Sequence, residues 1–340
     1  MNTKELGVLA VLTLAAIGAT AASLRSGPQG FASDKRGQPV FQGLVQRVNE
    51  VASVTIRDYE KSFTIERRED GFVNRESNYP VKADAFRDLV VGAAMLTYEE
   101  TKTADPSRFG DLGLAEPGAA PETVGRDVTL RDAKSNVLAS VTVGNRDTTV
   151  GGAQGGTYIR LADQKQTWLA RGEVRVPMPH TAWFEINLIN IGRDALAGIT
   201  VQGGGRDEIR TVAEKKGDDI KLANAPEGRE SDSGKLMRLS FMVDPISFQD
   251  VRKAIDAQKP DARQMIVTSR NGLRITYTSI GALADGWVRF AVEATAEEGN
   301  AEAEDFRKKT EGWDFKLAAH EVDMLGWGLM DVSAEAKPKS

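Results

Sequence analysis

The first pattern along the chain is an uninterrupted apolar stretch at residues 6–24, which contains no charged side chain. Its nineteen residues, at about 1.5 Å each, would form a helix of roughly 28 Å, close to the thickness of the hydrocarbon core of a membrane. A buried helix of a globular domain usually has a polar face, whereas this stretch offers only Thr13, Thr20 and Ser23. We therefore predict a transmembrane anchor at residues 6–24, preceded by a cytoplasmic leader at residues 1–5.

A cleaved signal peptide is the competing interpretation of this stretch. The small residues 19–21 resemble a cleavage site, but the apolar run is longer than a signal usually has, and Lys4 makes a weak basic region. A buried helix of a soluble protein is a third alternative. Basic residues on both sides fix the orientation only weakly, and we expect the N-terminus inside because a short leader before a long domain is the common export arrangement. This orientation predicts a single-pass protein of the inner membrane with its C-terminal domain in the periplasm.

Beyond a polar linker at residues 25–38, short alternations of apolar and polar residues indicate β-strands. In the first lobe, residues 39–190, they predict antiparallel meanders, and an apolar stripe with helical spacing predicts a helix over residues 82–98. Asp105 followed by Pro106 predicts the capped start of a short helical turn. The strands expected in this lobe cover residues 51–57, 62–67, 72–73, 127–131, 137–143, 157–161 and 167–170.

The second lobe, residues 191–333, repeats this order of elements. Helices are predicted over residues 232–242 and 245–255, residues 294–309 are expected to form an exposed loop or helix, and a tail at residues 334–340 is expected to be disordered. The strands expected here cover residues 197–201, 208–212, 219–222, 265–268, 273–278, 287–293, 314–318 and 322–325. The pattern therefore predicts an α+β fold of two similar lobes, each an antiparallel β-meander with a packed helix, after one N-terminal transmembrane helix.

Composition and charge exclude several classes of function. The chain has 340 residues with 44 basic and 49 acidic side chains, a net charge of −5 and no basic stripe, so nucleic acid is not an expected partner. It contains no cysteine, which excludes disulfides, thiolate nucleophiles, cysteine-based metal sites and a lipidated N-terminal cysteine. A chain of this length buries a substantial core without cross-links.

Motifs for catalysis or cofactor binding are missing from the sequence. His180 and His320 stand outside any compact ligand motif, so we expect turn or surface residues rather than zinc ligands. The glycine clusters at residues 151–156 and 203–205 lack the lysine and hydroxyl of a P-loop and predict hairpin turns. No Gly-x-Ser-x-Gly elbow occurs. We therefore expect no catalytic residue, metal or cofactor, while the many carboxylates leave a carboxylate-dependent hydrolase open as an alternative.

Three aromatic residues are the candidate partner contacts. Trp183, Phe184 and Trp327 adjoin polar loops, and exposed aromatic side chains often anchor protein partners. The competing interpretation places the same side chains in the core, where large aromatic residues are common. Exposure of these side chains would support docking to another protein.

The order of motifs resembles a known family, the bacterial domain-of-unknown-function family 4340. The most specific part of the likeness is Thr101-Lys102-Thr103-Ala104-Asp105-Pro106, followed by Phe109 and Leu112-Gly113-Leu114. The likeness covers about residues 40–175 directly and the second half by repetition. Further residues that carry it are Phe41-Gln42-Gly43-Leu44, Val54-Thr55-Ile56, Gly71-Phe72-Val73, Tyr79-Pro80-Val81, Gly156-Thr157-Tyr158 and Trp168-Leu169.

This resemblance implies a role in the cell envelope. The family is similar to membrane-anchored accessory proteins found with gliding-type ABC transporter components, which implies an ABC transporter permease or its extracytoplasmic subunit as partner, and it offers no catalytic residue to carry over. We therefore expect a membrane-anchored extracytoplasmic accessory subunit of an ABC-type transport system that acts by protein–protein docking. A binding module for an envelope glycan, lipid or peptide is an alternative from a different class, and the carboxylate-dependent hydrolase is the third.

Overall fold

The computed structural model describes residues 34–59, 61–116, 119–149, 155–162, 164–257 and 259–336. The predicted anchor at residues 6–24 and the leader before it lie outside this part of the chain. Among the residues that the structure describes, no helix is both long and apolar enough to cross a membrane. The fold below is therefore that of the domain that follows the linker.

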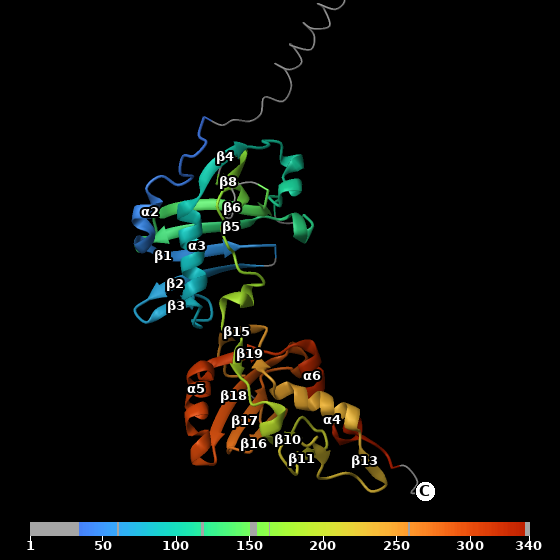
Figure 1. Cartoon of the computed structure of the whole chain (residues 1–340). Coiled ribbons are helices and arrows are strands. Elements are labelled where there is room, and N and C mark those ends of the chain that lie inside the picture. Colours follow the sequence, from blue (N-terminus) through green and yellow to red (C-terminus); the bar gives the residue numbers. More distant parts are fainter. Residues whose placement is uncertain are drawn as a thin grey trace, which may run out of the picture. The chain divides into compact units, whose positions relative to one another are not determined.

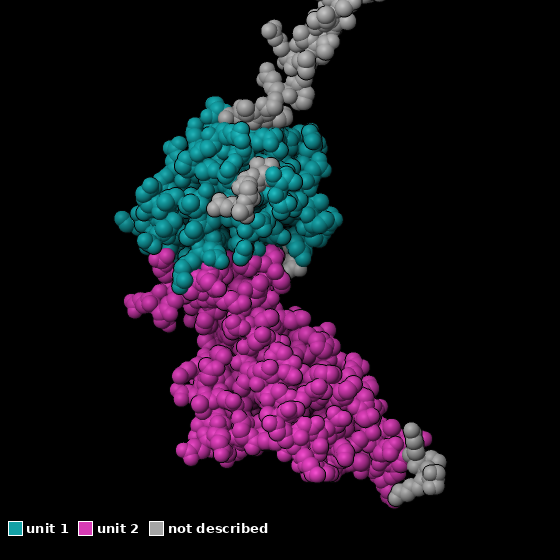
Figure 2. Space-filling model, viewed as in Figure 1, with its two compact units in different colours: residues 1–64, 86–176 teal, residues 65–85, 177–340 magenta. Residues whose placement is uncertain are grey.

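Two compact units make up this domain (Figure 2). The first contains residues up to 64 together with residues 86–176, and the second contains residues 65–85 and 177–340. Two large antiparallel sheets, each of eight strands, account for most of the strands. The fold is thus α+β with few helices, and its two large sheets agree with the prediction of two lobes.

The first sheet confirms the strands predicted in the first half and adds one. Its order is β3-β2-β1-β5-β6-β7-β8-β4. The added strand β4 occupies the end of the segment predicted as a helix, because Thr97, Tyr98 and Thr101 favour extended backbone and pair with β8. The strands are β1 (Val51–Arg57), β2 (Ser62–Arg68), β3 (Gly71–Asn74), β4 (Thr97–Thr101), β5 (Arg126–Asp132), β6 (Val137–Asp147), β7 (Gly156–Leu161) and β8 (Thr167–Arg171).

One long helix, α3 (Ala83–Met95), lies across the first sheet (Figure 1). Its buried residues Phe86, Leu89, Val90 and Ala93 recur at the spacing of a single helical face, as the apolar stripe predicts. The capped turn is confirmed as well, because the Asp105 side chain accepts a hydrogen bond from the backbone N–H of Ser107. The short helical pieces of this half are α2 (Leu44–Arg47), η1 (Val48–Glu50), η2 (Pro106–Arg108), η3 (Gly110–Leu112) and η4 (Pro121–Thr123).

The second sheet repeats the strand order of the first. It runs β12-β11-β10-β16-β17-β18-β19-β15, so every strand has a counterpart at the same place in the first sheet. In particular, β15 takes the edge position of β4, and a helix precedes each of these two strands along the chain. This order supports the predicted internal duplication. The strands are β10 (Leu196–Gln202), β11 (Ile209–Val212), β12 (Lys221–Leu222), β15 (Asp250–Lys253), β16 (Gln264–Ser269), β17 (Leu273–Ser279), β18 (Trp287–Ala294) and β19 (Trp313–Lys316).

Two helices of the second half follow the sequence pattern. The helix predicted over residues 232–242 is confirmed as α4 (Ser233–Ser240), which begins after the capping residue Asp232. The loop-or-helix segment contains α5 (Asn300–Thr310), which lies beside β18 (Figure 1). Phe306 of α5 is fully buried, so this mostly charged helix packs on the domain by one narrow face.

Two predictions for the second half are wrong. Residues 245–255 form β14 (Ile246–Ser247) and the edge strand β15 rather than a helix, because β15 pairs with β19 and β14 pairs with β9 (Asn187–Ile189). Residues 322–325 belong to a helix, α6 (Ala319–Leu325), rather than to a strand. The start of α6 is stabilised by the Glu321 carboxylate, which accepts the backbone N–H of Ala318 at 2.7 Å.

The tail predicted to be disordered at residues 334–340 begins inside a strand. β20 (Ser333–Glu335) pairs with β13 (Arg229–Ser231), and Arg229 Nε donates to the hydroxyl of Ser333 at 2.8 Å. Pairing with the distant strand β13 thus orders residues 334 and 335, although the composition of residues 334–340 is typical of a disordered tail. Residues 337–340 lie outside the part of the chain that the structure describes.

Candidate functional site

The first sheet has one apolar and one polar face. Neighbouring residues of a strand point to opposite faces, so Val54 and Ile56 of β1, which are buried, alternate with Thr55 and Arg57. We call the side that carries Arg57 the polar face. The register aligns one residue from each of five strands in a row on it: Arg57, Asp127, Thr142, Arg160 and Thr167.

A cavity of about 340 Å³ lies on the polar face. Arg57 donates from Nε to Asp127 at 2.9 Å, and the Thr142 hydroxyl donates to the other oxygen of the same carboxylate at 2.7 Å. Arg160 forms an ion pair with Glu116. The charged groups around this cavity are therefore paired with one another, Arg57 and Asp127 across neighbouring strands and Arg160 with the loop residue Glu116.

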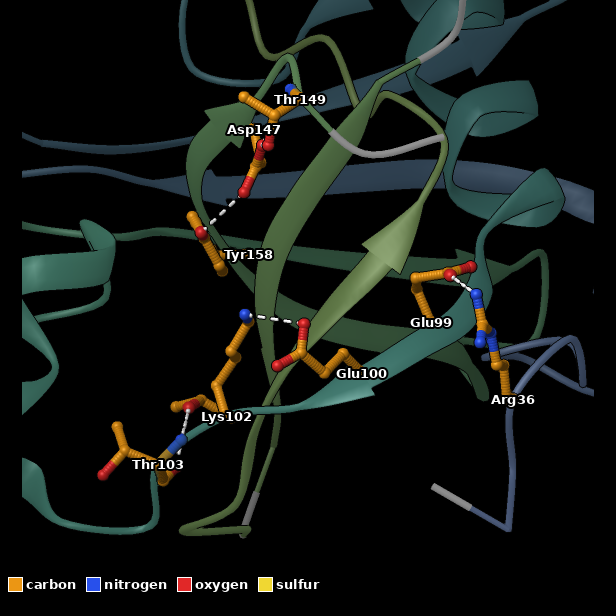
Figure 3. A network of polar contacts seen from close by, with 9 residues as sticks. Arg36, Glu99, Glu100, Lys102, Thr103, Asp147, Thr149 and Tyr158 are labelled. Atoms are coloured by element: carbon orange, nitrogen blue, oxygen red, sulfur yellow. Dashed lines mark hydrogen bonds and ion pairs between the residues drawn. The ribbon is translucent and has the colours of Figure 1, made fainter. Parts of the chain in front are cut away.

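Residues 101–114, which we call the Thr-Lys-Thr segment, border a second cavity, of about 540 Å³. Lys102 donates from Nζ to the Glu100 carboxylate at 2.8 Å, and the two side chains point toward each other (Figure 3). In the register of the sheet, Glu100 of β4 lies opposite Leu169 of β8, and Leu169 lies opposite Tyr158 of β7. Because Tyr158 precedes Arg160 by two positions on the same strand, Tyr158 and Glu100 lie on the polar face with Arg160. Other polar groups around this cavity belong to Thr103, Asp105, Arg108, Asp111 and Gln166.

The Thr-Lys-Thr segment is held in place by a buried hydroxyl. Thr167 is fully buried, and its Oγ1 donates to the carbonyl oxygen of Thr103 at 2.6 Å and accepts the N–H of Thr103 at 3.0 Å. The end of the segment requires glycine, because Gly113 has a φ of 66° and a Cβ there would lie 2.5 Å from Oδ1 of Asn145. These contacts make the segment a fixed wall of the cavity.

Tyr158 and Asp147 adjoin Lys102 and Glu100 (Figure 3). The Tyr158 hydroxyl donates to the Asp147 carboxylate at 2.8 Å, and the other oxygen of that carboxylate accepts the N–H and hydroxyl of Thr149. Burial, followed by the hydrogen bond and charge of Asp147, raises the pKa of Tyr158 to about 12. Hydrogen bonds from Thr149, and then from Tyr158, lower the pKa of Asp147. Both groups are thus poorly suited to exchange protons near neutral pH.

Tyr158 should ionise only at strongly alkaline pH. Because its pKa in the folded state lies above the usual value of 10.0, the neutral phenol stabilises the fold below pH 10, and this stabilisation is lost as the pH rises from about 10 to about 12. The difference in tyrosinate absorbance between the wild type and Tyr158→Phe measures this ionisation. Asp147→Asn should move it to lower pH, since the negative charge is removed, and an unchanged titration in that variant would contradict the assignment.

Glu99 of β4 binds Arg36, near the first described residue, and this contact lies away from the pair of Lys102 and Glu100 (Figure 3). Arg36 forms an ion pair with one oxygen of its carboxylate, and Arg171 donates to the other at 3.0 Å. Burial by itself raises the pKa of Glu99, but the hydrogen bonds and charges of Arg171 and Arg36 outweigh it and lower that pKa. The backbone N–H of Gly37 also donates to the carbonyl of Tyr98 at 2.7 Å. The last residues of the predicted linker therefore run along the edge strand β4.

The three aromatic residues predicted as candidate partner contacts are buried. Trp183, Phe184 and Trp327 are only 0 %, 3 % and 6 % exposed. The indole N–H of Trp183 donates to the carbonyl of Pro177 at 3.1 Å, and that of Trp327 donates to the Asp323 carboxylate at 3.2 Å. A buried side chain offers no surface to a partner, so the structure favours the core interpretation of these residues.

The two histidines lie apart. His180 starts a short helix, η6 (His180–Trp183), with Nε2 3.3 Å from the carboxylate of Asp250, and His320 is exposed on α6. Within the described ranges, no three His, Asp or Glu side chains gather closely enough to hold a metal ion. The glycines at residues 203–205 form the predicted turn between β10 and β11, whereas residues 151–154 lie outside the description.

The sequence alone missed the polar face. Each of the aligned residues that define this face belongs to a different strand, so no local sequence motif indicates the face. The Thr-Lys-Thr segment was singled out for its likeness to a family and not as a site. Alternation within the predicted strands, with threonine, serine and arginine at the polar positions, is the signal that would have indicated a polar face.

The fold defines a class of α+β protein built from two antiparallel sheets with the same strand order. A family model, Domain of unknown function (DUF4340), matches residues 72–265, more than half of the chain, and the chain belongs to this family. The match confirms the family that the motifs predict, and it contains the Thr-Lys-Thr segment. The comparison with curated proteins gives no match, and the comparison with solved structures gives none either.

Proposed function

We propose that this protein is an accessory subunit of an ABC-type transport system that acts by protein–protein docking, held at the periplasmic side of the inner membrane by residues 6–24. The chemistry of the polar face carries the proposal. Its acids and bases are paired with one another, and the pKa values of Tyr158 and Asp147 are moved away from neutrality. Such a surface is suited to binding by hydrogen bonds and charge complementarity rather than to proton transfer.

The path of the chain supports a partner at the membrane. Residues 25–33 separate the proposed anchor from the first described residue, and nine extended residues reach at most about 32 Å. The chain then runs along β4, the strand that carries Glu100 beside the second cavity. We expect a permease, or the extracytoplasmic subunit bound to it, to be the partner within that reach.

A photo-crosslinker placed at the second cavity tests the docking proposal. Arg108 borders this cavity and is 68 % exposed, so a photoreactive phenylalanine analogue at position 108 of the full chain should leave the fold intact. After irradiation of cells, we expect this position to capture a permease or an extracytoplasmic transporter subunit. The matched control carries the same group at Glu304 on α5. This residue is 64 % exposed and belongs to the second unit, whereas Arg108 belongs to the first.

Two outcomes would contradict docking through this face. One is the absence of any transporter subunit from the products of position 108, and the other is equal capture from positions 108 and 304. The mass of the mature protein tests the tether separately. A mature N-terminus beginning after residue 21 would remove the anchor and refute that part of the proposal.

A binding module for an envelope glycan, lipid or peptide is the second candidate function. Hydroxyls around the first cavity favour it: those of Thr129 and Ser140 lie 3.1 Å apart, and Thr55 and Thr142 stand beside them. Each hydroxyl both donates and accepts, which matches a ligand rich in hydroxyl groups. Crosslinked products with the mass of a glycan or lipid, in place of a transporter subunit, would favour this candidate.

The hydrolase alternative draws no support from the second cavity. Of the carboxylates that line it, Glu100 is paired with Lys102, while Asp105 and Asp111 are exposed. Hydrogen bonds from Ser107 also lower the pKa of Asp105, which makes it a poor proton donor. We therefore do not propose a hydrolase.

A further inference from the structure

The second unit contains a cavity of about 190 Å³ beside the turn between β10 and β11. Gly203, Gly204 and Gly205 form this turn with φ values of 80°, 65° and 67°, a conformation that favours glycine. A Cβ at Gly203 would clash with the carbonyl oxygen of Ala262, so the turn comes as close to the neighbouring backbone as glycine permits. The turn therefore forms one tight wall of the cavity.

Arg263 lines this cavity although only 3 % of it is exposed. Its guanidinium donates to the carbonyl oxygens of Leu325 at 2.9 Å, of Gly203 at 2.7 Å and of Trp327. All three acceptors are neutral, and none of the ion pairs among the described residues includes Arg263, although the negative charges of Asp261 and Asp331 act on its guanidinium from a greater distance. Arginine has five N–H groups, and two remain after these bonds. The charges of Asp261 and Asp331 offset only part of the cost of burying this guanidinium, because its pKa is still lowered, and an anion beside it would offset more of that cost.

Positive charge dominates the rest of the cavity wall. Arg206 and Lys259 line it against a single acid, Asp261, whose carboxylate already accepts a backbone N–H at 3.1 Å. Arg206 is 56 % exposed and forms only a loose surface pair with Asp331 at 3.4 Å. Burial, and then the charge of Arg206, lower the pKa of Arg263, and the charges of Asp261 and Asp331 counteract this lowering only in part.

The hydroxyl of Ser279 is a second, independent observation at this cavity. Ser279 lines it and is 5 % exposed. Its backbone N–H donates to the carbonyl of Arg263 at 2.9 Å, but among the residues that the structure describes its hydroxyl has no hydrogen-bond partner. The hydroxyl oxygen is not one of the enclosed side-chain atoms that lack a partner, so the hydroxyl is open to the cavity. The Ser279 hydroxyl is thus an available donor in the cavity that Arg263 also lines.

We propose that this cavity binds a phosphate group, with Arg263 and Ser279 as the inner donors and Arg206 and Lys259 as the outer cations. Phosphate oxygens accept several charge-assisted hydrogen bonds at once, and guanidinium groups match them well. The volume lies below the about 300–1,000 Å³ of pockets for drug-sized ligands, so the site admits the phosphate and little of the molecule that carries it. The carrier is either the free ion or the head group of an anionic lipid. This site belongs to the second unit and does not depend on the docking function.

Thermal unfolding of the full chain in nonionic detergent tests the site. Inorganic phosphate, compared with chloride at the same ionic strength, should raise the unfolding midpoint until the site saturates, because a ligand of the folded state stabilises it. Ser279→Ala should weaken phosphate binding about tenfold through the loss of one hydrogen bond to a charged group. The double variant Arg206→Ala, Lys259→Ala should lose the shift. Lys216→Ala removes an exposed lysine of the same unit outside the cavity and should keep it.

A second arm identifies the carrier of the phosphate. Short-chain phosphatidylglycerol replaces inorganic phosphate in the detergent solution, with short-chain phosphatidylcholine as the zwitterionic control. A shift with phosphatidylglycerol alone assigns the site to a lipid head group, and a shift with inorganic phosphate alone assigns it to the free ion. The proposal is overturned if neither ligand shifts the midpoint, or if the double variant responds as strongly as Lys216→Ala.

Discussion

Replacing Asp314 with alanine should lower the free energy of unfolding by about 3 kcal/mol. Asp314 lies on β19 and is fully buried. One oxygen of its carboxylate accepts from Nε of Arg289 on β18 at 2.8 Å. The other lies 3.6 Å from Nε of Arg252 on β15 and accepts the backbone N–H of Ile255 at 3.2 Å. A single carboxylate thus ties together three neighbouring strands of the second sheet.

The exposure of the two arginines sets the size of this effect. Removing one partner of a buried ion pair costs about 3–5 kcal/mol when the remaining charge stays buried. The side chains of Arg252 and Arg289 are 33 % and 31 % exposed, so in the variant they can turn toward water. The loss should therefore fall at the lower end of that range.

Denaturant unfolding of the full chain in detergent, followed by tryptophan fluorescence, measures this loss. Asp305→Ala is the matched control, because Asp305 also pairs with a cation, Lys309, but is 64 % exposed. Surface pairs contribute about 0–1 kcal/mol, so this control should stay close to the wild type. Equal losses in the two variants would show that burial does not determine the strength of the Asp314 cluster.

Tyr79→Ala should be the most destabilising single change, at about 3–5 kcal/mol. Tyr79 is 4 % exposed and belongs to the second unit, although it follows β3 of the first sheet along the chain. Its ring meets four aromatic rings edge to face, with centroid distances of 5.1–5.8 Å. These rings belong to Phe184, Phe248, Trp313 and Phe315. Alanine would remove the central ring and leave a cavity among the other four.

The matched variant for this position is Tyr79→Phe, which keeps the ring and removes the hydroxyl. It should cost less than about 1.5 kcal/mol, because its shape and volume are nearly conserved. The same fluorescence experiment applies, since the indole of Trp313 lies against Tyr79 and also donates to the carbonyl of Ser77 at 2.9 Å. If Tyr79→Ala and Tyr79→Phe have the same midpoint of denaturant unfolding, the aromatic cluster does not stabilise the second unit.

Local patterns of the sequence were sufficient for most of the individual elements. The strands of the first sheet alternate apolar and polar residues, because one face is buried and the other is polar, and this alternation is visible in β1 and β5 without any tertiary information. The face of α3 and the cap at Asp105 follow equally from local spacing and local hydrogen bonding. The repeated order of these elements also predicted two similar halves.

The same local patterns did not predict the edge strands β4 and β15, the short strand β14 or the candidate sites. Residues 246–253 contain apolar residues at a spacing compatible with a helix, and only pairing with β9 and β19 makes them strands. The proposed phosphate site depends on Arg263, directly before β16, on Ser279 at the end of β17 and on the turn at residues 203–205. No spacing along the chain connects these positions, since the hydrogen bonds that join them are between distant segments.

By itself, the sequence determined the apolar run at residues 6–24, the class of fold and its duplication, because each rests on composition or on short-range periodicity. The family came from the resemblance of local motifs to a known family, which the family model confirms. Tertiary structure alone decided where the conspicuous side chains lie. It buried Trp183, Phe184 and Trp327, which the sequence offered as docking contacts, and it gathered the polar face of the first sheet from five strands. The physical reason is that burial and side-chain proximity depend on which strands pair, and pairing is a property of the whole chain.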